Sequence, residues 1–300
     1  MAENIDNITD WTIMVYMAGD NNLSIDMAYA LEQIKSVSNQ NDNINLLVYF
    51  DGYSSSVPTL YCDFTDSDSV NYYRSFSIKD KLIKRRQEND FNENSASANN
   101  VINFVDWCVN KVEHKVDGKI VRGRKAKNYA MIFSGHSFGF QSEGLFKDEK
   151  ANYSMNLSKL KWMFERLTLP QAELEKLAEL EQNWHEGDWD DDTIKERTTE
   201  IIGKPLTLLG FDSCVMSMLE VGCQFKKVAE TMVASEGSIP NAGWSYAQIL
   251  LGKIANDKNA TAKEIAASFV ENFVRQQNKY ALADISVDMT AWDLKALGDL

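Results

Sequence analysis

The sequence has little cysteine, histidine and proline, and it has no long apolar run. Four scattered cysteines do not make a disulfide framework, and neither they nor the three histidines have zinc-site spacing. No segment is long and apolar enough to cross a membrane. The first residues are polar and acidic, unlike a signal peptide. We therefore expect no membrane association and no required cofactor. The protein is expected to be cytoplasmic, or secreted or periplasmic with its signal removed.

Basic residues are also too few to suggest a nucleic-acid partner. The chain has 44 Asp and Glu against 31 Lys and Arg, which gives a formal net charge of -13. Proteins that bind nucleic acids normally present a basic face. The composition therefore argues against DNA or RNA as a partner, although it says nothing about the fold.

Apolar strand patterns alternate with helical patterns along the chain. Short apolar runs typical of strands occupy residues 11–18, 45–50, 59–64 and 129–133, and helical spacing occupies residues 23–34 and 101–112. This order is typical of a largely parallel sheet that is covered by helices. We therefore expect an α/β fold in which residues 1–300 form a single domain.

One apolar run predicts a strand that ends close to a cysteine. Residues 207–211 are apolar, and Asp212, Ser213 and Cys214 follow them. Apolar residues at helical spacing come next, so the pattern predicts a helix that begins directly after Cys214. A thiol at the positive end of a helix dipole is stabilised as the thiolate. The other three cysteines fit strand or helix core patterns, and we expect them only to pack.

A histidine ends a second strand of the same design. The apolar residues 129–133 lead into Ser134, Gly135 and His136. Open α/β sheets hold their sites at the carboxyl edge of parallel strands. His136 and Cys214 are therefore candidates for a general acid/base and a nucleophile. The pattern alone leaves a purely structural cysteine as an open alternative.

These segments resemble the clostripain family of cysteine peptidases, in the clan of caspases, legumain and gingipains. The matching pieces are residues 11–23, 134–136, 211–216, 234–236 and 243–246. The resemblance implies a caspase-like fold and a bacterial endopeptidase that cleaves peptides or proteins after Arg or Lys. It also implies that His136 is the general acid/base and that Cys214 is the nucleophile. Members of the family generally continue further, so we expect the natural chain to extend past Leu300.

The resemblance also places an acidic residue of the substrate pocket at Asp212. Because Asp212 precedes Cys214 by two residues, both are predicted to point to the same side of the strand. Its carboxylate can pair with Arg or Lys of a substrate. The alternative is that Asp212 caps the following helix. Ser235, Glu236 and Trp244 are further candidates for the pocket wall.

Backbone N–H groups of Cys214 and Ser137 are predicted to hold the oxyanion of the acyl transfer. The family usually has Gly where this chain has Ser137, and Ser has less backbone freedom. This departure favours one alternative, an inactive binding scaffold that has kept the fold. A cysteine amidase that acts on a small molecule is a third hypothesis. The presence of both His136 and Cys214 favours an active enzyme.

The segment between His136 and Cys214 is longer than a crossover connection needs. Residues 151–204 are predicted to form a helical, acidic insertion outside the central sheet. The acidic cluster at residues 188–192 is interpreted as a solvated loop, with a calcium site as the alternative. A second polar run, Asp20-Asn21-Asn22, is interpreted as a helix cap rather than as a metal site.

Members of the clostripain family are often zymogens that are activated by a cut between the His strand and the Cys strand. The cut follows a basic residue. Lys147 and Lys150 come soon after His136, and they are the candidate sites of self-cleavage. The alternative is that both lysines are ordinary surface charges.

Overall fold

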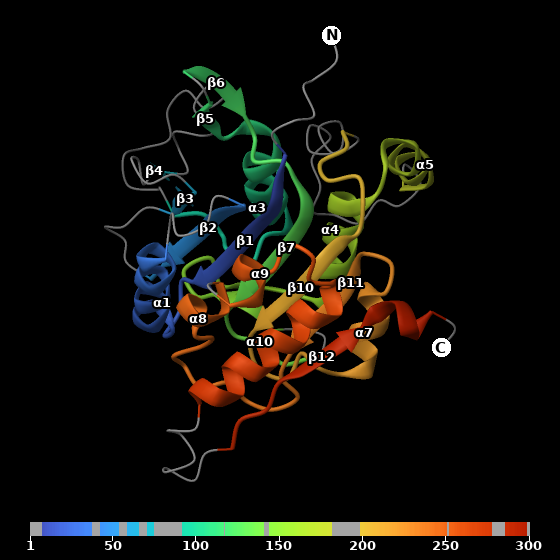
Figure 1. Ribbon diagram of the computed structural model, residues 1–300. Helices are drawn as coiled ribbons and strands as arrows, with labels where there is room; N and C mark the ends of the chain where they lie inside the picture. Colours follow the sequence, from blue (N-terminus) through green and yellow to red (C-terminus); the bar gives the residue numbers. More distant parts are fainter. Residues whose placement is uncertain are drawn as a thin grey trace.

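The chain folds around an eight-stranded sheet with the order β12-β11-β10-β7-β1-β2-β3-β4 (Figure 1). The computed structural model describes residues 8–37, 43–53, 59–65, 71–74, 92–116, 118–140, 144–181, 199–250, 252–277 and 286–298. The strands are β1 (Thr9–Gly19), β2 (Ile44–Gly52), β3 (Leu60–Asp63), β4 (Asn71–Arg74), β7 (Ala126–Ser134), β10 (Leu206–Asp212), β11 (Ala229–Ala234) and β12 (Thr290–Asp293).

The middle of the sheet is parallel and its edges are antiparallel. Strands β11, β10, β7, β1 and β2 pair in parallel, whereas β12, β3 and β4 are added antiparallel. Strand β1 is buried from Trp11 to Gly19, as expected for a parallel strand that is covered on both faces. The predicted α/β fold with a largely parallel sheet is confirmed.

Alternate side chains of each strand enter two separate cores. Met14 and Tyr16 of β1 belong to one core, and Ile13 and Val15 belong to the other. The first core contains residues of α3 (Ala98–Asp106), the π-helical turn η2 (Trp107–Lys111), α4 (Leu157–Thr168), α7 (Leu219–Phe225) and the 3-10 turn η3 (Leu294–Leu297). The second contains residues of α1 (Ser24–Ser36), α8 (Tyr246–Leu250), α9 (Lys253–Asn256) and α10 (Ala262–Gln276). Figure 1 shows these helices on opposite faces of the sheet.

Two small antiparallel hairpins stand apart from the main sheet. One pairs β5 (Glu113–Val116) with β6 (Lys119–Arg122), and the other pairs β8 (Leu145–Asp148) with β9 (Tyr153–Met155). In the sequence, the second hairpin follows His136 and precedes β10, so it belongs to the connection between the two strands that lead to the candidate catalytic residues. Among the described helices, none has the length and apolar character needed to span a membrane.

The segment predicted as an insertion is partly built into the domain core. Leu160, Met163 and Phe164 of α4 are fully buried in the first core, against the sheet that the insertion was expected to avoid. The predicted extent of the insertion, residues 151–204, is therefore wrong at its start, because α4 is a covering helix of the crossover from β7 to β10. Helix α5 (Gln171–Glu181) follows it, and the acidic cluster at 188–192 lies outside the described residues.

Candidate active site

Strands β7 and β10 end side by side. Ser134 and Asp212 are paired across the parallel ladder, and the N–H of Gly135 donates to the carbonyl of Asp212 at 3.3 Å. His136 and Cys214 each follow this pair by two residues. The register therefore brings the predicted acid/base and the predicted nucleophile to one edge of the sheet, as the sequence indicated.

A pocket opens at this edge and contains the three principal candidates. Its lining residues are Leu23, Asp26, Met27, Ala30, Ser134, Gly135, His136, Asp212, Ser213, Cys214, Ile239, Pro240, Asn241, Ala242 and Gly243. His136, Cys214 and Asp212 thus line the same pocket, although His136 comes from a distant part of the chain. Asp26 is a second carboxylate of the pocket, and it was not predicted from the sequence.

Cys214 differs from the buried cysteines in its surroundings. Its side chain is partly exposed, and its Sγ accepts a hydrogen bond from the N–H of Ile239 at 3.3 Å. Cys62 and Cys108 are fully buried, and burial raises the pKa of both thiols, so neither is a nucleophile. Cys223 lies on α7, away from the pocket lining.

The helix predicted directly after Cys214 begins later than expected. Helix α7 starts at Leu219, and Val215 has a φ of 60°, which lies outside the helical region. The N–H of Val215 donates to Gly237, and the N–H of Ser217 donates to Ser235. These tertiary hydrogen bonds replace the helical ones, so Cys214 lies in a loop. The prediction that a helix dipole stabilises its thiolate is therefore wrong.

His136 is held by a residue that the sequence did not reveal. Its Nε2 lies 2.6 Å from Oδ1 of Asn22, and its carbonyl accepts from the N–H of Phe146 at 2.7 Å. With the amide oxygen as acceptor, Nε2 carries the proton and Nδ1 remains available for proton transfer. Burial lowers the pKa of His136, because the imidazolium is partly removed from water. Asn22 was missed because it was interpreted as part of a helix cap.

Asp212 is a buried residue of the pocket lining and accepts three hydrogen bonds. The donors are the hydroxyl of Tyr246 at 2.8 Å, the N–H of Trp244 at 3.0 Å and the hydroxyl of Ser134 at 3.2 Å. Burial raises the pKa of Asp212 to about 6, although these donors lower it in part. The alternative capping role is wrong, because α7 begins only at Leu219.

Comparisons with known proteins give matches to the clostripain family. The model of the clostripain family matches residues 192–299, which include Asp212 and Cys214. Clostripain of Hathewaya histolytica is 25% identical over 256 residues, which cover 79% of this chain and 41% of clostripain. The predicted resemblance to the clostripain family is confirmed. This chain spans about two fifths of the length of that relative.

Solved structures of C11 proteases share the fold of this chain. One is a secreted C11 cysteine protease of Bacteroides thetaiotaomicron in complex with an irreversible peptide inhibitor. It has a TM-score of 0.61 at 19% identity, and the match covers 96% of this chain and 67% of that one. Another is an inactive zymogen C11 protease of Parabacteroides distasonis, with a TM-score of 0.59 at 18% identity and coverages of 99% and 65%.

Three residues expected in the pocket wall lie outside the lining of the described pocket. The indole of Trp244 is fully buried and packs on Gly210, where an added Cβ would come within 2.9 Å of its Cη2. Ser235 donates to Oδ1 of Asp288 at 2.9 Å, and the N–H of Glu236 donates to Oδ2 of Asp288 at 2.6 Å. Ser235 and the backbone of Glu236 therefore support the loop that follows β11, and a role for the three residues in substrate binding stays a prediction.

Ser137, the departure from the clostripain-family pattern, joins the two catalytic loops. Its side chain is buried, and its hydroxyl donates to the carbonyl of Cys214. Nearby, Gly139 has a φ of 67°, and a Cβ there would approach the carbonyl of Val215 to 2.7 Å. The loops after β7 and β10 are therefore in close contact. The hydroxyl makes a hydrogen bond that Gly cannot, so Ser137 by itself does not indicate an inactive scaffold.

Proposed function

We propose that this chain is a cysteine endopeptidase that cleaves after Arg or Lys. Cys214 is the nucleophile, and His136 is the general acid/base. The observation that carries the proposal is the single pocket lined by Cys214, His136 and Asp212. A nucleophile, a proton carrier and an anion at the base of one pocket are what cleavage beside a cationic side chain requires.

The reaction proceeds by acyl transfer to sulfur. The Cys214 thiolate attacks the scissile carbonyl carbon, the new C–S bond forms, and the carbonyl electron pair moves to oxygen. The N–H groups of Cys214 and Ser137 stabilise this oxyanion. His136, which has taken the proton of the Cys214 thiol, donates that proton to the leaving amine as the C–N bond breaks, and the neutral imidazole later takes a proton from the water that hydrolyses the thioester. Asn22 keeps the imidazole in one tautomer and orientation.

Asp212 provides the selectivity for Arg or Lys. A carboxylate has about four acceptor sites, and three hydrogen bonds from Tyr246, Trp244 and Ser134 leave room for a substrate cation. Because Asp212 is buried, its charge is poorly screened and strongly favours a cationic partner. A substrate with a neutral side chain leaves this carboxylate without its ion pair.

Hydrolysis of a fluorogenic Arg peptide, with Cys214→Ala as the control, tests the proposal. Loss of hydrolysis in the variant is the expected result. Two other outcomes would support the alternatives instead. An inactive parent protein that still binds the peptide would indicate a binding scaffold. Cys214-dependent hydrolysis of small amides, with no hydrolysis of peptides, would indicate an amidase.

Selectivity for Arg should depend on pH through Asp212. Its pKa of about 6 means that the carboxylate is charged above this pH and neutral below it. We expect the ratio of kcat/KM for an Arg peptide to kcat/KM for its citrulline analogue to fall roughly tenfold between about pH 8 and pH 5. Any pH effect on the chemical step itself affects both substrates and cancels in the ratio. A ratio that is constant with pH would exclude Asp212 as the selecting anion.

Self-cleavage should occur after Lys150 rather than after Lys147. Lys147 lies within β8, its carbonyl accepts from Asn21 Nδ2 at 2.9 Å, and the Asp148 side chain that follows is buried. Lys150 is exposed in the turn between β8 and β9. We expect mass spectrometry to find fragments that meet after Lys150 in the parent protein and an intact chain in Cys214→Ala. An intact parent protein with full activity would exclude self-activation.

A further inference from the structure

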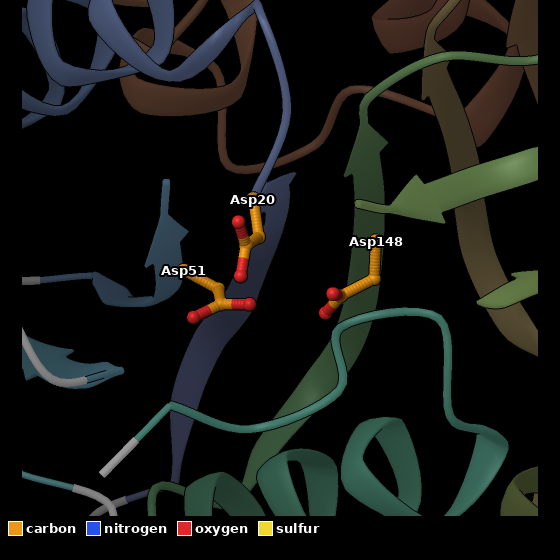
Figure 2. Close-up of side chains that lie close together, drawn as sticks. All are labelled: Asp20, Asp51 and Asp148. Atoms are coloured by element: carbon orange, nitrogen blue, oxygen red, sulfur yellow. The ribbon is translucent and has the colours of Figure 1, made fainter. Parts of the chain in front are cut away.

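Three buried aspartates from separate elements lie close together at the ends of β1, β2 and β8. Asp20 directly follows β1, Asp51 lies in β2, and Asp148 ends β8. All three are almost completely removed from solvent. One carboxylate oxygen of each lies within 4.8 Å of the others, and Figure 2 shows the three side chains pointing toward a common centre.

Three of the six carboxylate oxygens in this cluster have no hydrogen-bond donor. Both carboxylate oxygens of Asp20 and Oδ2 of Asp51 are buried without a hydrogen-bond partner. Within the described residues, no Lys or Arg forms an ion pair with any of the three aspartates. Buried carboxylates in proteins are normally hydrogen-bonded, paired with a cation or bound to a metal. This cluster therefore lacks a positive charge at its centre.

The remaining oxygens are fixed by donors from outside the cluster. Oδ1 of Asp51 accepts from the Thr59 hydroxyl at 2.8 Å and from Asn92 Nδ2 at 3.0 Å. Asp148 accepts from the N–H of Ser95 at 2.8 Å and from the N–H of Ala151 at 2.7 Å. Metal ligands are typically oriented by such outer hydrogen bonds. These bonds hold Asp51 and Asp148 in place, and Oδ2 of Asp51 still has no donor.

We propose that Asp20, Asp51 and Asp148 bind a calcium ion. Carboxylate oxygens are the ligands of hard divalent cations. Calcium–oxygen bonds of about 2.4 Å place ligands on opposite sides of the ion about 4.8 Å apart, whereas magnesium brings them to about 4.2 Å. The oxygens lie within 4.8 Å of one another, a separation that calcium can span without the strict octahedral geometry that magnesium demands. The sequence interpretation of Asp20 as part of a helix cap is wrong, because α1 has no side-chain cap hydrogen bond.

The ion would join the two segments that hold His136. The carbonyl of Asp20 accepts from the N–H of Glu149 at 2.8 Å, and Asn21 Nδ2 donates to the carbonyl of Lys147. Two residues after Asp20, Asn22 contacts the His136 imidazole. Calcium should therefore stabilise the contact between the end of β1 and the β8 hairpin. Binding of the ion does not rest on the proposed peptidase activity, but an effect on His136 does.

Calcium binding is tested on Cys214→Ala protein, in which self-cleavage cannot interfere. The protein is stripped with EGTA and titrated by calorimetry with calcium chloride and, separately, with magnesium chloride. We expect one calcium per chain and a rise in Tm of roughly 5 °C or more at saturating calcium. Magnesium should produce a smaller shift. Because these readouts do not involve catalysis, an inactive protein can still confirm the site.

Matched variants locate the ion. Asp51→Asn, added to the same background, should remove the calcium-induced rise in Tm, whereas Asp257→Asn, at an exposed position, should retain it. Circular dichroism checks that each variant is folded. If Asp51→Asn does not fold, Asp20→Asn takes its place. No calcium response in the parent protein, or an equal response in the parent and the folded aspartate variant, would overturn the proposal. An equal response in both proteins would show that calcium binds at another acidic segment.

Discussion

Peptide hydrolysis should be lost when either Cys214 or His136 is replaced by Ala. We expect kcat/KM for an Arg peptide to fall by more than about 10³-fold in each single variant, because neither half of the dyad works alone. Steady-state kinetics with a fluorogenic Arg peptide measures the loss. The kcat/KM of the double variant should be no lower than that of either single variant, because the two residues act as a unit.

Both catalytic variants should remain folded. Cys214 and His136 are partly exposed in loops, so their removal costs little apolar burial. We expect the free energy of unfolding to change by less than about 1 kcal/mol, which denaturant titration measures. Cys223→Ala is the matched control, since Cys223 is also partly exposed but lies on α7 outside the pocket lining. Full activity in Cys214→Ala, or lost activity in Cys223→Ala, would contradict the assignment of the nucleophile.

The central sheet was predictable because parallel strands carry a strong local signal. Strand β1 is apolar on both faces, so its continuous run at residues 11–18 stands out from the polar segments around it. Strands β7 and β10 show the same pattern, and each is followed by small polar residues. Since the carboxyl ends of parallel strands meet at one edge, the proximity of His136 and Cys214 followed from sequence alone.

The loop after Cys214 was not predictable from local pattern. Apolar residues from Val215 onward have helical spacing, but the backbone reaches a φ of 60° at that residue. The hydrogen bonds that hold it come from Ser235 and Gly237, which belong to a later part of the chain. A local pattern contains no information about such tertiary partners. The same limit applies to α4, whose role in the core is set by the strands that it covers.

The acidic cluster shows a second limit of sequence reasoning. Asp51 lies opposite Ala18 in the β1–β2 ladder, close to Asp20, but this register is set by the pairing of whole strands. Asp148 reaches the same place only because the β8 hairpin folds back toward the end of β1. Each aspartate separately resembles an ordinary turn residue. Only the assembled structure shows the three buried carboxylates together, with unpartnered oxygens on Asp20 and Asp51.

Asp212→Asn should reduce the preference for basic substrates strongly. The substitution keeps the size of the side chain but removes a buried negative charge. We expect kcat/KM for an Arg peptide to fall roughly 30–150-fold, which corresponds to about 2–3 kcal/mol of lost transition-state stabilisation. The citrulline analogue should lose much less, because it never formed the ion pair. Measuring both substrates separates lost selectivity from general damage to the site, which would lower both values equally.

Asp26→Asn is the matched control for this experiment, because Asp26 is the other carboxylate among the pocket-lining residues. Asp26 lies in the first turn of α1 and is partly exposed, so solvent screens its charge more than that of Asp212. We expect less than about a fivefold change in kcat/KM for the Arg peptide. The reverse order of effects would assign recognition of the basic side chain to Asp26 and leave Asp212 as a support for the loop at Gly243 and Trp244.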